Sequence, residues 1–190
     1  MNRREAISSV ALLLGGTIIG GEIFSLAGCK SSPTQVNDLF NTDEVAYMNE
    51  IAETIIPETN TPGAKAAKTG EFMAVMVKDC YTPEDQKIFK DGLNTINEKS
   101  KSKFGALFTD LKPEERKKLL TELDGEQKKY NLNEANKTTP HYFRMMKELS
   151  LLGFFTSEIG GTKVLSYVEV PGRFDACIDY KKGDPVYLNP

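Results

Sequence analysis

Signals that start α-helices recur along this chain, and they limit the folds open to it more than any other feature. Thr82-Pro83-Glu84-Asp85 combines a capping hydroxyl, a proline for the first turn and acidic residues at the positive end of the helix dipole. Pro113-Glu114-Glu115 has a similar pattern, and Asn41 and Glu44 have the spacing of a capping box. The sequence therefore predicts a mainly helical protein.

Apolar residues follow these signals at the three- and four-residue spacing of an α-helix. The predicted helices run from Thr42 to Ile56, from about Phe72 to Cys80, from Pro83 past Ile96, from Pro113 with an interruption at Gly125, and from Pro140 to Glu158. After Gly160-Gly161, β-branched residues and Pro171-Gly172 favour extended segments and turns. We therefore expect one domain over residues 41–190, mainly α, with an irregular C-terminal tail that wraps the helices.

The first 28 residues have the parts of a secretory signal. Arg3 and Arg4 supply the positive charge, and the stretch from Ala6 to Gly21 is uncharged and largely apolar. This stretch is shorter than the roughly 20 residues that a membrane-spanning helix needs. We therefore expect residues 1–28 to be a signal peptide that is removed.

A lipid attachment site is predicted at the end of this signal. Leu26-Ala27-Gly28-Cys29 resembles the lipobox of bacterial lipoproteins, in which small residues admit the peptidase and the cysteine accepts a diacylglycerol. Two or more acyl chains hold a protein stably at a bilayer. We expect lipid on Cys29, a polar tether over residues 29–40, and a location on the periplasmic side of a bacterial membrane. The alternative is an ordinary cysteine in a membrane segment.

The start of the signal also bears on the export route. Arg3 and Arg4, followed by Glu5-Ala6-Ile7, resemble a twin-arginine export signal. A plain basic n-region is the alternative, because Ala6 stands where such signals usually have a large apolar residue. Twin-arginine export carries folded proteins, so it would allow a cofactor-loaded partner to travel with the chain.

Cys80 and Cys177 are the thiols that remain once Cys29 is lipidated. Because an exported protein has left the reducing cytoplasm, we consider a disulfide between them. Closing so long a loop would stabilise the fold by roughly 4 to 5 kcal/mol in the chain-entropy model. A bridge from either thiol to a partner subunit is the alternative, since sequence does not show whether the two α-carbons come within bonding range.

Residues that could carry a reaction are few. His141 is the only histidine and stands at a predicted helix start, and a lone histidine is more often a capping or surface residue than a catalyst. The chain has too few histidines and cysteines for an ordinary zinc, iron-sulfur or covalent haem site, and it has no glycine-rich strand-to-helix turn for a flavin. We therefore expect no catalytic, cofactor-binding or metal-binding residue. A hydrolase or thiol oxidoreductase that uses His141 or Cys80 is the enzyme alternative.

Charge and hydrophobicity indicate what the protein binds. The net charge of −3 gives no reason to expect nucleic acid as a partner. The helix that ends near Glu158 is apolar on both sides, so it must be central in the fold or face a partner. Phe154, Phe155 and Tyr167 are the candidate partner surface.

Five segments in this order resemble the gluconate 2-dehydrogenase subunit 3 family over about residues 43–180. They are Ile51-Ala52-Glu53-Thr54-Ile55-Ile56-Pro57, Pro62-Gly63-Ala64, the stretch 104–120, Phe154-Phe155-Thr156-Ser157-Glu158-Ile159-Gly160, and the stretch 167–172 that ends in Pro171-Gly172. The stretch 173–177 is similar to that of family members from Bacteroidetes.

This resemblance implies a role without chemistry of its own. In that family, a large flavoprotein subunit of the glucose-methanol-choline type carries FAD and oxidises the sugar or sugar acid, and the small subunit escorts it. The resemblance therefore implies a non-catalytic subunit that exports and membrane-anchors such an enzyme. A stand-alone ligand-binding or structural lipoprotein is the alternative.

Overall fold

The computed structural model describes residues 34–136, 138–170, 172, 177–184 and 186–187. Gln35–Pro190 forms one compact unit, and the fold described here is that of this unit. The signal residues Arg3, Arg4, Leu26, Ala27 and Gly28 and the lipid site Cys29 lie outside the described residues. No helix within the described part is long and apolar enough to cross a membrane.

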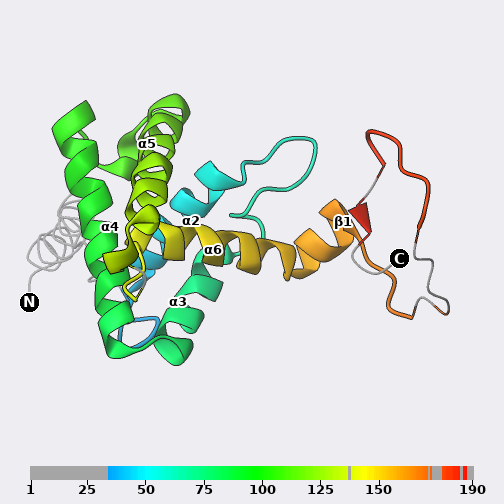
Figure 1. Cartoon of the computed structure of the whole chain (residues 1–190), viewed down its shortest axis with the longest axis horizontal. Helices are drawn as coiled ribbons and strands as arrows, with labels where there is room; N and C mark the ends of the chain where they lie inside the picture. Colours follow the sequence, from blue (N-terminus) through cyan, green and yellow to red (C-terminus); the bar gives the residue numbers. More distant parts are fainter. Residues whose placement is uncertain (1–33, 137, 171, 173–176, 185, 188–190) are drawn as a thin grey trace, which may run out of the picture. The chain divides into compact units, whose positions relative to one another are not determined.

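The described part of this unit is mainly α, which confirms the predicted fold class (Figure 1). Its long helices are α2 (Thr42–Ile55), α3 (Thr69–Cys80), α4 (Pro83–Phe104), α5 (Pro113–Leu132) and α6 (Tyr142–Phe155). Short turns of 3₁₀-helix form η1 (Phe108–Asp110) and η2 (Glu134–Asn136), and η3 (Gly160–Val164) is a π-helix. The two-residue strands β1 (Leu165–Ser166) and β2 (Val186–Tyr187) pair in parallel.

The helix starts follow the local signals in the sequence. The Asn41 side chain accepts hydrogen bonds from the backbone N–H groups of Asp43 and Glu44, and the Glu44 carboxylate accepts from Asn41 N–H, which completes the capping box. Thr82 Oγ1 accepts from Asp85 N–H at 3.2 Å. The interruption predicted at Gly125 is wrong, because α5 continues through it to Leu132. A single glycine costs a helix only about 1 kcal/mol, and the packing of Leu119, Leu120 and Leu123 outweighs this cost.

Helix α6 is central in the fold. It contacts α2, α3, α4 and α5, and in Figure 1 it crosses the other helices. Its buried side chains include Phe143, Met146, Leu149 and Phe154. Gly153 allows α3 to come close, since a β-carbon there would lie 2.5 Å from the Phe72 ring. The all-round apolar character of this helix is thus mainly that of a core element.

Residues 35–41, which we call the docked segment, differ from the free tether that the sequence predicts. Phe40 is fully buried and packs edge-on against Phe89 of α4. Asn37 Oδ1 accepts from the N–H groups of Leu39 and Phe40, and its Nδ2 donates to the Ala74 carbonyl of α3 at 3.1 Å. The polar composition of this stretch does not indicate these contacts, because one buried phenylalanine and one asparagine are enough to hold the segment in place.

The described residues of the C-terminal tail are irregular apart from β1 and β2. Their apolar side chains remain largely exposed, among them Tyr167, Val170, Ile178 and Tyr180. Strand β1 contacts η3 and pairs with β2. The exposure of these side chains gives no sign that this part of the tail wraps the helices, because a wrapping tail would bury its apolar residues against them.

Candidate functional site

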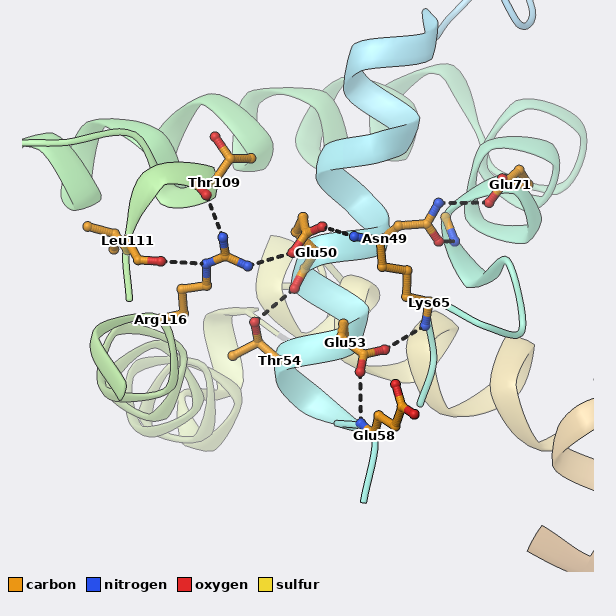
Figure 2. Close-up of polar contacts among 11 residues, drawn as sticks. Asn49, Glu50, Glu53, Thr54, Glu58, Lys65, Glu71, Thr109, Leu111 and Arg116 are labelled. Atoms are coloured by element: carbon orange, nitrogen blue, oxygen red, sulfur yellow. Dashed lines mark hydrogen bonds and ion pairs between the residues drawn. The ribbon is translucent and has the colours of Figure 1, made fainter. Parts of the chain in front are cut away.

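A cluster of charged residues surrounds the second half of α2 (Figure 2). The Glu50 carboxylate binds Lys65 through one oxygen and Arg116 Nη1 through the other, at 2.5 Å for the arginine. Arg116 of α5 also donates from Nε to the Leu111 carbonyl at 3.0 Å and from Nη2 to the Thr109 carbonyl. Glu50 therefore ties α2 to the start of α5 and to the loop that carries Lys65.

The electrostatics of Glu50 fit this role. Burial raises the pKa of its carboxyl, but the hydrogen bonds from Lys65 and Arg116 outweigh burial and hold the pKa below its usual value. Glu50 therefore stays ionised at neutral pH with both oxygens engaged by cations. A carboxylate held in this way orders the fold and is poorly suited to act as a general acid or base.

Glu53, one turn further along α2, organises the loop that follows the helix. Its two carboxylate oxygens accept from the backbone N–H groups of Glu58 and Lys65, each at 2.8 Å. A β-carbon at Gly63 would lie 2.3 Å from Glu53 Oε1, so a side chain there would displace the carboxylate from its present position. Two of the five segments that resemble the family, 51–57 and 62–64, thus belong to one loop structure that Glu53 holds in place.

Asn49 joins α2 to α3. Its Oδ1 accepts from Gly70 N–H at 2.7 Å, and its Nδ2 donates to Glu71 Oε2 at 2.8 Å. A β-carbon at Gly70 would lie 2.5 Å from the Val45 carbonyl oxygen, which shows how closely the two backbones approach. No local pattern in the sequence indicates Asn49, Glu50, Lys65 or Arg116, because their partners are distant in the chain.

Other charged side chains also form ion pairs within the chain. A groove of about 380 Å³ between α4 and α5 is crossed by the ion pairs Lys99–Glu126 and Lys103–Glu122. Among the described residues, no three His, Cys, Asp or Glu side chains group as metal ligands would. The arrangement of charges supports a role in holding helices and loops together.

His141 lies at the N-terminus of α6 and has the capping role, one of the two roles expected of it. Its Nδ1 accepts from Phe143 N–H at 3.2 Å, and its ring stacks on Tyr142 with ring centroids 4.4 Å apart. Burial lowers the pKa of the imidazole, and the nearby Glu126 opposes this effect in part. The neutral ring is thus the form that caps the helix.

Acid should therefore weaken the fold through His141. The folded-state pKa is below the unfolded value of 6.5, so the unfolded chain binds the proton more readily, and stability falls as pH drops below that value. Urea unfolding at pH 7.5 and 5.5 measures the loss. His141→Asn caps without titrating and should remove this part of the pH dependence, whereas His141→Ala should cost about 1 kcal/mol at pH 7.5. An unchanged pH dependence in His141→Asn would contradict this role.

Two exposed cysteines and three aromatic residues complete the predicted sites. Cys80 and Cys177 are both free and exposed, so the predicted disulfide is not formed in this structure.

Phe154 is only 1% exposed, which removes it from the candidate partner surface, because α6 turns that ring into the core. Phe155 and Tyr167 are exposed, as a partner surface requires.

The exposed end of α6 carries two further apolar side chains, Leu151 and Leu152, beside Phe155. Leu151, Leu152 and Phe155 are 39%, 46% and 38% exposed, and we call these three residues the α6 patch. They share one side of the helix because positions three and four apart are neighbours. The sequence shows that this helix is apolar on all sides, but such a pattern does not indicate which of its residues face outwards.

The fold and these contacts define a mainly helical protein whose charged residues secure its own loops and whose central helix ends in an exposed apolar patch. The sequence model of gluconate 2-dehydrogenase subunit 3 matches residues 42–172, so the chain belongs to that family of dehydrogenase subunits. The match confirms the resemblance found in the sequence, and it runs from the first residue of α2 to Gly172. No curated protein and no solved structure matches the chain.

Proposed function

We propose that this chain is a non-catalytic small subunit that escorts, exports and membrane-anchors a flavin-dependent gluconate or sugar dehydrogenase. The catalytic partner is a flavoprotein of the glucose-methanol-choline type, and it carries the FAD. Family membership over residues 42–172 is the observation that carries this proposal. The α6 patch supports it, since exposed apolar side chains on one side of a helix are suited to a protein interface.

The proposed complex reaches its location through the N-terminal residues. Arg3 and Arg4 direct the folded chain and its flavoprotein to the twin-arginine route, and lipid on Cys29 then holds the complex at the periplasmic face of the membrane. The ion pairs of Glu50 tie α2 to α5 and to the loop that carries Lys65, which restricts the movement of these parts. A rigid body is an efficient escort, because less conformational freedom is lost when it binds.

Replacing the lipidated cysteine tests the anchoring. Cys29→Ser removes the acceptor for the acyl chains, so we expect both this chain and the flavoprotein to move from the membrane fraction to a soluble fraction. The measurement is fractionation followed by immunoblotting and flavin fluorescence. Cys80→Ser is the matched control, because it removes an exposed thiol that carries no lipid, and it should leave both proteins in the membrane. A Cys29→Ser chain that stays in the membrane fraction would rule out anchoring through this cysteine.

A further inference from the structure

The docked segment is held by both neighbouring helices at one end of the helical body. Lys90 of α4 donates from Nζ to the Leu39 carbonyl at 2.7 Å, and Lys78 of α3 forms an ion pair with Asp38 at 3.0 Å. The Asn37 contact to Ala74 and the buried Phe40 ring complete the attachment. Figure 1 shows the segment beside the end of the body where α3 leads into α4. The fold therefore fixes the place at which the chain leaves towards Cys29.

The remaining connection to the lipid site is short. From Cys29 to Gln35 the chain makes six Cα-to-Cα steps, which span at most about 21 Å when fully extended. Helix α4, with 22 residues, is about 33 Å long, and its last residue, Phe104, lies about 21 Å along the helix from Lys90. If the Phe104 end faced the bilayer, the connection would have to be almost fully extended, which is entropically unfavourable.

We propose that the end of the body that carries the docked segment faces the membrane surface, with the Phe104 end of α4 directed away from it. The occupant of this face is the lipid surface to which Cys29 is attached, so this inference rests on the proposed lipidation. The short connection and the contacts of residues 35–41 set the orientation. The α6 patch consists of other residues, so membrane attachment and partner binding use separate parts of the body.

Energy transfer from two labelled positions to acceptor-labelled headgroup lipids tests this orientation. The lipidated protein is placed in vesicles, in a Cys177→Ser background that leaves one thiol. A donor on Cys80, two residues beyond Lys78, reports on the proposed membrane-facing end. A donor on Lys101→Cys, with Cys80→Ser, reports on the far end, because residue 101 lies about 17 Å along α4 from Lys90. We expect about twofold more transfer from Cys80 than from the Lys101→Cys position.

An insertion separates this inference from the proposed function. About 20 Gly and Ser residues placed between Thr34 and Gln35 add a flexible reach of roughly 25 Å, and transfer from the two positions should then become equal. Equal transfer without the insertion, or a difference that persists with it, would overturn the proposed orientation. A chain isolated from its host without lipid on Cys29, or a lipidated chain that does not sediment with vesicles, would instead contradict the proposed anchoring.

Discussion

Gly70→Ala should destabilise the fold by roughly 3 kcal/mol, because the new methyl group has no room between α2 and α3. The β-carbon would lie 2.5 Å from the Val45 carbonyl oxygen and 2.9 Å from the Asn49 backbone nitrogen. Backbone atoms cannot move aside as a flexible side chain can. The two helices would have to separate, and the hydrogen bond from Gly70 N–H to Asn49 Oδ1 would be lost or strained. Urea unfolding measures the change in the free energy of unfolding.

The same substitution at Gly125 is the matched control. Gly125 lies inside α5, and no atom lies within 4 Å of the place where its β-carbon would be. Alanine there restricts the unfolded chain and favours the helix, so Gly125→Ala should stabilise the protein by about 1 kcal/mol. If Gly70→Ala were as stable as Gly125→Ala, the result would contradict the close approach of the α2 and α3 backbones at Gly70.

Leu152→Glu combined with Phe155→Glu should abolish recovery of the flavoprotein with this chain. Both side chains are exposed in the free subunit, so the double variant should fold. In a complex, two carboxylates would be buried against a surface that fits apolar groups, and an unpaired buried charge is strongly unfavourable. Central interface residues often contribute about 2 kcal/mol or more each, so affinity should fall by at least 100-fold. Titration with the purified flavoprotein measures this change.

Leu132→Glu is the control for the patch. Leu132 is 83% exposed at the end of α5, and it is not part of the α6 patch. The variant adds one carboxylate, against two in the double variant, in place of an exposed apolar side chain. It therefore separates a local interface from a general effect of added charge. Full affinity in the double variant would show that the partner binds elsewhere.

The starts of α2 and α4 could be predicted because their causes are local. Asn41 with Glu44, and Thr82 with Pro83, act within one turn of helix, so a short stretch of sequence contains the whole interaction. The capping bond that His141 accepts from Phe143 N–H is local in the same way. Local interactions require no knowledge of how the helices pack.

The remaining features depend on residues that meet only in the folded chain. Glu50 and Arg116 are 66 positions apart, so no local pattern pairs them. Asn37 binds Ala74 across 37 positions, so composition alone predicts a free tether where the structure has the docked segment. The pairing of Cys80 with Cys177 failed likewise, because a count of cysteines contains no distance. Periodicity placed Phe154 and Leu152 in one apolar helix but could not show that the first is buried and the second exposed.

The most direct test of the proposed function is to isolate the full chain from its host membranes in mild detergent, with an affinity tag at its C-terminus. We expect a flavoprotein to be recovered with it, bound FAD to be detected by absorbance, and the complex to oxidise gluconate or a sugar when an electron acceptor is supplied. The isolated chain alone should show no such activity. A monomeric, flavin-free isolate would contradict the proposal that this chain is the accessory subunit of a flavin-dependent dehydrogenase.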